Sequence, residues 1–434
     1  KALILKSPTK SGTFLFNTLG ICYTNNVILS ILHRIATLRT PVRSLLFLYF
    51  INCFTGTLTA VFIQIKVFQA FPDLSINIIG AMSAFTGTMV GFCVFGYFAS
   101  LFSLDAKQGF YYSFISYALG LFLISQVSTI FSVYVSLFVY GLGVGFFWLT
   151  LHTYELSETK DHERDFYSSL LQGGAQLISV IAPLFATVLI WISVSIFHSS
   201  SFTLLFAVSP FFYLLGFFCF KGIQEYKPEQ IEFADIAHFL FERKNRIAQL
   251  YLGAGGSTHI LAPTLLPIVL LFILGNELRV GIYSTFAAVL STFLIVILGH
   301  YRNIGNRIFL FGVSAIGISG LTIYLGYSLT FTALIMFTVL GAILQPIMKI
   351  SEHVVSLQTM ENIGRSNKDF YATMILRDFS LWFWRMIVGF FLLFVCQFLP
   401  STHDKLSLGL YLLATMVFLT FIGARVLVTK MGIK

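Results

Sequence analysis

Apolar stretches long enough to cross a lipid bilayer follow one another along almost the whole chain. About 20 consecutive apolar residues span a membrane as an α-helix. Only 10% of the 434 residues are charged, whereas soluble domains carry about 25%. Short segments of alternating hydrophobicity, which are typical of outer-membrane barrels, do not occur. The sequence therefore predicts an all-α polytopic membrane protein rather than a soluble domain with a single anchor.

Twelve such stretches are predicted to be transmembrane helices. They cover residues 44–68, 74–98, 109–125, 129–152, 166–196, 202–220, 247–274, 281–298, 308–326, 330–350, 370–399 and 408–428. Several are longer than 25 residues, which indicates tilted or kinked helices. Residues 12–33 are also apolar but contain three asparagines. For this segment we favour an interfacial helix, and an additional span is the alternative.

The distribution of lysine and arginine predicts the orientation. Twelve spans place both termini on one side, and 23 of the 27 Lys and Arg residues fall on that side. Basic residues accumulate in cytoplasmic loops, so both termini are predicted to be cytoplasmic and the protein to lie in the cytoplasmic (inner) membrane. The net charge of +9 then faces anionic lipid headgroups and requires no nucleic-acid partner.

One short string occurs twice, each time at the start of a predicted span. "RDFYSSLL" (164–171) opens span five and "KDFYATMI" (368–375) opens span eleven, while the polar stretch 221–246 separates the spans six and six. An internal repeat of the kind found in transporters explains this spacing; a chance match between Phe-rich segments is the alternative. Each Asp would stabilise a helix N-terminus, and each Tyr would join the interfacial aromatic belt. We expect a segment 1–43, bundles 44–220 and 247–430, and a linker 221–246.

These features resemble the major facilitator superfamily. Twelve helices, cytoplasmic termini and a central cytoplasmic loop match that family over about residues 40–430. Its loop signature is altered here: the 2–3 loop reads "GYFASLFSLDAKQGFYYS" and the 8–9 loop reads "GHYRNIGNR", which lacks the Asp. The strings "GVGFFWLTLHTYELSETKDHERDFYSSLLQG" and "ILRDFSLWFWR" resemble a divergent bacterial branch, from which no substrate can be carried over. The resemblance implies two pseudo-symmetric six-helix bundles that rock around a central cavity lined by helices 1, 4, 7 and 10, with contributions from 5 and 11.

Arg385 is the strongest candidate for a substrate-binding residue. It lies near the middle of span eleven, where a charge is rare and faces the protein interior or a water-filled space. Asp378 precedes it by two helical turns, about 10 Å along the axis, so the two are not expected to pair directly. Asp378 is a candidate for proton coupling. The alternative for both residues is a buried ion pair that fixes helix packing.

Further candidates lie on the spans that the resemblance places around the cavity. Gln172 and Gln176 belong to a polar stripe on span five, which either lines the cavity or makes hydrogen bonds between helices, and Asn52 lies in span one. Span seven, "GAGGSTHILAPTLLP", is predicted to bend or break. It contains His259, which is either a second proton-coupling candidate or a packing residue. "GLGVG" (141–145) predicts close helix packing rather than nucleotide binding.

The cytoplasmic helix ends carry the predicted gate, and no motif indicates catalysis. The gate candidates are Glu155, Arg164, Asp165, Lys368 and Asp369. ATP-binding and metalloprotease motifs are absent, so no cofactor, metal or enzymatic activity is predicted. We expect a monomeric secondary transporter for a small anionic or zwitterionic solute, with coupling to protons left open. The alternatives are an exporter or flippase of amphipathic drugs or lipids and a non-transporting membrane assembly protein.

Overall fold

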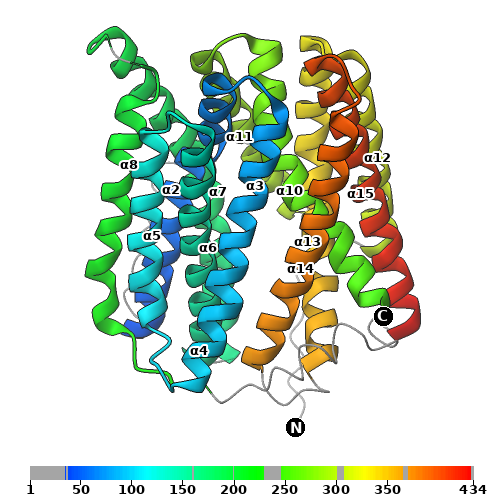
Figure 1. Ribbon diagram of the computed structural model, residues 1–434. Coiled ribbons are helices and arrows are strands. Elements are labelled where there is room, and N and C mark those ends of the chain that lie inside the picture. The colour runs from blue at the N-terminus through cyan, green and yellow to red at the C-terminus, as the bar shows by residue number, and fades with distance from the viewer. Residues whose placement is uncertain are drawn as a thin grey trace, which may run out of the picture.

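The computed structural model describes residue 35 and residues 38–158, 161–198, 200–228, 246–300, 307–364 and 370–431. These residues form twelve long helical segments that run side by side (Figure 1). The first six are α2 (Thr40–Ala70), α3–η1–α4 (Leu74–Met89, Val90–Val94, Phe95–Leu101), α5 (Gln108–Ser125), α6 (Ile130–Glu158), α7 (Asp161–Ser195) and α8–η2 (Thr203–Leu215, Gly216–Gly222). The second six are α10 (Arg246–Leu274), α11 (Glu277–His300), α12 (Arg307–Ser328), α13 (Phe331–Gly364), α14 (Phe370–Cys396) and α15 (Thr402–Met431).

The helices follow the predicted spans closely. Among the described residues, ten helical segments are long and apolar enough to cross a membrane; α5 and α11 complete the twelve. Two differences stand out. Helix α13 continues to Gly364, well past the predicted end at residue 350, and the second span contains a π-helical turn, η1. The proposed interfacial helix 12–33 and most of the linker 221–246 lie outside the described residues.

The helix contacts repeat with a period of six spans. In the first half α2 packs on α7 and α8, and α5 packs on α6 and α8; in the second half α10 packs on α14 and α15, and α12 packs on α13 and α15. Contacts between the halves are also equivalent, because α3 packs on α14 just as α11 packs on α7, and α2 meets α10. Thus α7, which contains the first Asp-Phe-Tyr string, and α14, which begins at the Phe of the second, have equivalent neighbours. This supports an internal repeat; the exact bundle boundaries remain a prediction.

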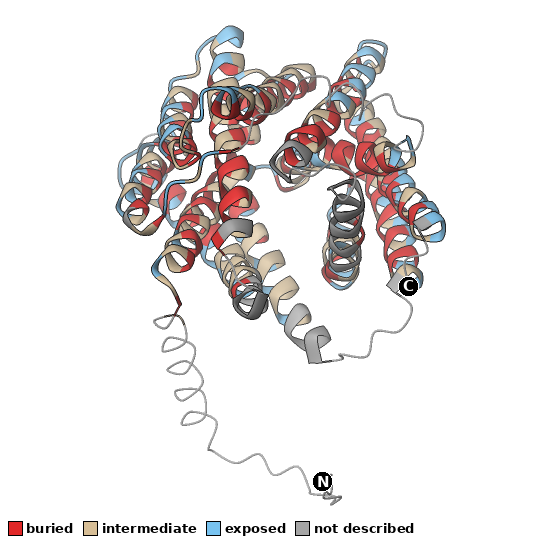
Figure 2. Ribbon diagram, turned by 90° about the horizontal axis from the view of Figure 1, so that it is seen from below, coloured by how far each residue is buried: buried red, intermediate tan, exposed pale blue. Residues whose placement is uncertain are grey.

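Buried residues lie where the helices face one another, and exposed residues cover the outer faces (Figure 2). Glycines permit a close approach between α3 and α6. A Cβ atom on Gly141 would lie 1.9 Å from the Ala84 carbonyl oxygen, and one on Gly145 would lie 2.3 Å from that of Thr88. The prediction that "GLGVG" serves close helix packing is therefore confirmed.

Span seven was predicted to bend or break. The bend stays a prediction, but the span does not break, because α10 is one continuous helix despite Pro263 and Pro267. Its glycines instead make room for side chains of α14. A Cβ atom on Gly253 would lie 2.6 Å from the Trp384 ring, and one on Gly256 would lie 2.9 Å from Leu381. Small residues at such positions let membrane helices approach closely.

Two polar contacts join the halves at the end of the molecule formed by the α2–α3, α10–α11 and α14–α15 connections, which we call the outer end. Lys405 at the start of α15 lies 3.6 Å from the carboxylate of Asp73, which precedes α3. The amide of Gln69, at the end of α2, donates a hydrogen bond to Glu277 at the start of α11. The two halves are therefore held together at the outer end.

Candidate functional site between the two bundles

Arg385 lies where three helices from both halves meet. Its side chain is 6% exposed. The guanidinium carbon lies 4.5 Å from the ring centroid of Phe85 on α3, and Nη2 lies 3.4 Å from Nδ1 of His259 on α10. The prediction of an inward-facing charge in the middle of span eleven is consistent with this position. Sequence reasoning did not identify Phe85, because nothing distinguishes it from the 48 other phenylalanines.

The charge of Arg385 has no adjacent counter-ion among the described residues. No carboxylate oxygen within them lies within ion-pair distance, and Nε has no hydrogen-bond partner there. The Asp378 carboxylate acts on Arg385 only through space. A buried cation–π contact contributes about 2 kcal/mol, whereas the charge costs about 2.5–3.5 kcal/mol at the centre of a membrane helix. Among the described residues, Arg385 therefore does not form the buried ion pair that was the alternative to a binding role.

His259 is exposed although it lies in the middle of α10. Helix α10 packs against helices of both halves, namely α2, α3, α11, α13, α14 and α15. An exposed side chain on such a helix faces an internal space rather than lipid. Arginine can only donate hydrogen bonds, so Nδ1 of His259 accepts and the neutral ring carries its proton on Nε2. That N–H is available to a ligand beside the guanidinium.

The charges around His259 are positive. Arg385, Arg377 and Lys349 all act on its ring electrostatically. An imidazolium here would be repelled by three cations, which argues against a proton-carrying role for His259 and favours an attraction for anions.

A second polar cluster lies in the first half, between α2, α6 and α7. Nδ1 of His152 lies 3.0 Å from Oε2 of Glu155, and the Tyr167 hydroxyl donates to Oε1 of the same carboxylate at 3.1 Å. The Trp148 ring packs against His152 in a tilted arrangement with centroids 5.2 Å apart, and Tyr49 of α2 packs edge-on against Trp148. Tyr167 is 2% exposed, so its predicted place in an interfacial belt is wrong: the hydroxyl serves Glu155 instead.

Glu352 occupies the corresponding place in the second half. It follows the transmembrane part of α13, and its Oε1 lies 3.3 Å from where a Cβ atom on Gly255 of α10 would be. Its backbone oxygen accepts a hydrogen bond from Tyr251 at 3.0 Å. Burial raises the pKa of the Glu352 carboxyl, and Lys349 opposes part of this shift. Each half thus places a glutamate beside a tyrosine, in the first half between α6 and α7 and in the second between α13 and α10.

The remaining predicted site residues are less closely connected to this centre. Asn52 is buried on α2, and its Oδ1 has no partner among the described residues. Gln176 is half-buried, and its backbone oxygen accepts from Ser179, so part of the polar stripe is satisfied within α7. The structure does not describe the side chains of Gln172, Arg164 and Asp165, and it does not describe Lys368 and Asp369 at all.

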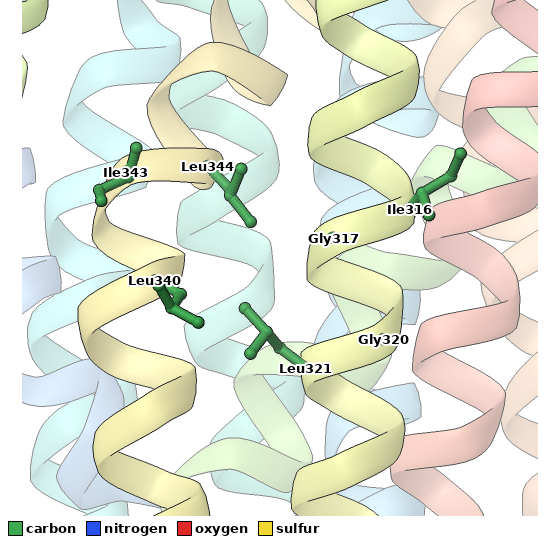
Figure 3. Close-up of a pocket in the computed structure, with 7 residues that line it drawn as sticks. All are labelled: Ile316, Gly317, Gly320, Leu321, Leu340, Ile343 and Leu344. Carbon is green, nitrogen blue, oxygen red and sulfur yellow. The ribbon is translucent and has the colours of Figure 1, made fainter.

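The groove between α12 and α13 is a poor alternative site for a polar solute. It has a volume of about 400 Å³ (Figure 3) and is lined by Ile316, Gly317, Gly320, Leu321, Leu340, Ile343 and Leu344. These residues bring no polar side chain, and Ile316 and Leu340 are exposed on the outer surface. Such a groove suits the lipid that surrounds it.

Comparison with known proteins identifies the family. Residues 45–365 match the family model of the Major Facilitator Superfamily. The fold is similar to a crystal structure of a mutant nucleoside transporter NupG, with a TM-score of 0.63 and 12% identity over 89% of this chain and 99% of that one. It is also similar to a mutant of the Escherichia coli fucose:proton symporter FucP, with a TM-score of 0.56 and 16% identity over 89% and 98%. A search of curated proteins finds no match. The match over most of the chain shows that this membrane protein belongs to the major facilitator superfamily.

Proposed function

We propose that the protein is a secondary transporter that moves a small anionic or zwitterionic solute by alternating access. The observation that carries this proposal is the guanidinium of Arg385, which lies between the two halves with no adjacent carboxylate among the described residues. An anionic group of the solute would supply the missing counter-charge. The sequence contains no phosphate-binding GxxxxGK[ST] motif, which argues against ATP as the energy source.

The expected binding mode uses the donors that the site leaves available. Arginine carries five N–H donors, and His259 takes one of them. A carboxylate or phosphate of the solute would bind the remaining donors of Arg385 together with the Nε2–H of His259. Because Phe85 belongs to the first half and His259 and Arg385 to the second, a bound solute would respond to movement of either half.

The structural neighbours provide a useful contrast. The names of NupG and FucP refer to a nucleoside and to fucose, which are uncharged at neutral pH. Sequence identities of 12% and 16% show that the fold is shared but give no information on the substrate of this protein. An uncharged solute is therefore the competing possibility that the experiment must separate from an anionic one.

Uptake into proteoliposomes tests the proposal. The panel contains radiolabelled mono- and dicarboxylates, amino acids, sugar phosphates, nucleosides and fucose. We expect uptake of at least one charged compound, its loss in Arg385→Leu, and a reduced rate in Arg385→Lys, because lysine cannot form a bidentate contact. Arg279→Lys, at the exposed start of α11, is the matched control and should transport normally.

Two results would contradict the proposal. One is that the protein takes up only the uncharged compounds of the panel, or takes up no compound at all. The other is a well-folded Arg385→Leu protein that carries the charged solute as fast as the unmodified protein. The elution profile in detergent separates a folding defect from a loss of transport.

A further inference from the structure

Arg385 belongs to a stripe of residues on α14 that packs against α3 of the other half (Figure 1). The spacing of three, four and seven positions places the members of this stripe on one side of the helix. The stripe consists of Trp382, Arg385, Met386 and Gly389, and the residues that it meets on α3 are Met82, Phe85 and Thr86. The guanidinium is therefore part of a continuous contact between the two halves.

Gly389 lets α14 approach α3 closely. A Cβ atom at this position would lie 2.8 Å from Cγ of Met82, so a larger residue would push the helices apart. One turn earlier, the sulfur of Met386 lies 3.8 Å from Oγ1 of Thr86. These contacts keep the two helices near each other, but they are weakly directional and do not determine how α14 is rotated on α3.

The hydrogen bond between Trp382 and Thr86 is directional. The indole Nε1–H, which can only donate, lies 3.3 Å from Oγ1 of Thr86. The Thr86 hydroxyl gives its own proton to the carbonyl oxygen of Met82 at 2.8 Å, which leaves a lone pair to accept from the indole. A short chain of hydrogen bonds thus runs from α14 into the backbone of α3, and the bonds in such a chain strengthen one another.

This hydrogen bond lies one helical turn from the guanidinium. Trp382 and Arg385 are three residues apart, about 4.5 Å along the helix axis, and their partners Thr86 and Phe85 are neighbours in the chain. The guanidinium carbon lies 4.5 Å from the centre of the Phe85 ring, and Nη2 lies 3.4 Å from His259. Rotating α14 by one residue position, about 100°, would break all three contacts together.

We propose that Trp382 and Thr86 are positioning residues of the solute site: their hydrogen bond fixes α14 on α3, so that Arg385 rests on Phe85 and presents its remaining N–H donors to the solute. This inference rests on the proposed function, because it concerns the same guanidinium. Both contacts join one half to the other. A movement that separates α3 from α14 therefore breaks them at the same time, and the anion site is complete only while these two helices touch.

Thr86→Val tests the positioning role, because valine has the shape of threonine but cannot accept a hydrogen bond. With a charged solute identified by the uptake panel, we expect the KM to rise about three- to tenfold, the range expected for the loss of one hydrogen bond, and kcat to stay within about twofold. Thr86→Ser keeps the hydroxyl and should restore the KM. Thr88→Val is the matched control, because the Thr88 hydroxyl donates within α3, to the Ala84 carbonyl oxygen at 3.0 Å.

Double variants show whether the effect passes through Arg385. If Thr86 acts by positioning the guanidinium, Thr86→Val should raise the KM in the natural protein but add nothing in the Arg385→Lys protein. Trp382→Phe removes the donor of the same bond and should reproduce the KM of Thr86→Val. It also serves as the test if Thr86→Val does not fold. An unchanged KM in these variants, or an equal rise in the Arg385→Lys background, would overturn the proposal.

A second measurement needs no solute and separates this inference from the proposed function. In NMR of the chain labelled with ¹³Cζ-arginine, a carbon that lies over an aromatic face is shifted upfield. The Arg385 signal, assigned by its absence in Arg385→Leu, should lose this shift in Phe85→Leu and in Thr86→Val but keep it in Thr88→Val. Loss of the shift in Thr86→Val would support the positioning role even if the panel yields no charged solute. A signal that Thr86→Val leaves in place would refute that role even if the solute is anionic.

Discussion

At the level of single residues, the contact between α3 and α6 is a tight steric constraint. Substituting Gly141 with Ala would place a Cβ atom 1.9 Å from the Ala84 carbonyl oxygen, so the helices must move apart. Overpacking of this kind costs about 1–3 kcal/mol, and we expect Gly141→Ala to lower the apparent Tm in detergent by several degrees. Gly320→Ala is the control, because its Cβ atom would meet nothing within 4 Å. Equal melting temperatures for the two variants would contradict the packing observed here.

Single-residue chemistry was only partly predictable from the sequence. Arg385 could be singled out because a charge in the middle of an apolar run is costly wherever the helix packs. Its neighbours could not be predicted, since Phe85 and His259 meet it only through the rotation of three helices about their axes. His152 is different, because its hydrogen-bond partner lies close to it in the chain. Glu155, three residues further along the same helix, was within reach of sequence reasoning.

At the level of elements, hydropathy predicted the spans well and the helix ends less well. Hydropathy reports where a segment leaves the apolar part of the bilayer, but a helix need not end there. Helix α13 continues as a helix through the polar stretch "SEHVVSLQTMENIG", because its backbone hydrogen bonds do not require lipid. The π-helical turn η1 leaves no signal in an apolar sequence. It lies where Cys93 and Gly96 meet Ile375 of α14.

The outer contacts between elements predict how the cycle can be arrested. Cysteines at Asp73 and Lys405, whose side-chain tips meet at 3.6 Å, should be bridged by a bis-methanethiosulfonate reagent, because the two shorter side chains need a spacer to meet, and this cross-link should stop transport in proteoliposomes until it is reduced. Ser83 and Tyr134 form the matched pair within the first half, where the Ser83 hydroxyl donates to the Tyr134 carbonyl. A cross-link at that pair should leave transport unchanged. Full activity of the cross-linked Asp73–Lys405 pair would show that the outer end does not open.

The same contact has a defined pH dependence. Partial burial opposes ionisation of Asp73, but hydrogen bonds from Ser75 and the charge of Lys405 outweigh it and lower the pKa of the carboxyl. A lowered pKa in the folded state means that the contact stabilises above the ordinary Asp range and is lost only as the pH falls through the lowered value. We therefore expect Asp73→Asn to leave the shape of the pH profile of transport between pH 5 and 8 unchanged. A profile that shifts in this variant would show that the Asp73 carboxyl titrates within that range and contradict its lowered pKa.

At the level of the whole molecule, the arrangement of the spans as six plus six could be predicted because two independent features of the sequence agreed. The repeated Asp-Phe-Tyr string and the central polar stretch both divided the spans in half, and the equivalent helix contacts follow the same division. Orientation is different, because helix packing has no preferred direction across a membrane. It depends on Lys and Arg outside the apolar core, and so it remains a prediction of the charge distribution.

The orientation can be tested on one hairpin of exposed loops. Ser103 precedes α5 and Ser128 follows it, and both are exposed. If both termini are cytoplasmic, Ser103 faces the cytoplasm and Ser128 the opposite side. In a background with the five natural cysteines replaced, a membrane-impermeant maleimide added to intact cells should label Ser128→Cys and not Ser103→Cys, and permeabilisation should expose both. Labelling of Ser103→Cys alone from outside would invert the protein in the membrane. Glu155, Glu352 and the polar cluster around His152 would then face the outer solution.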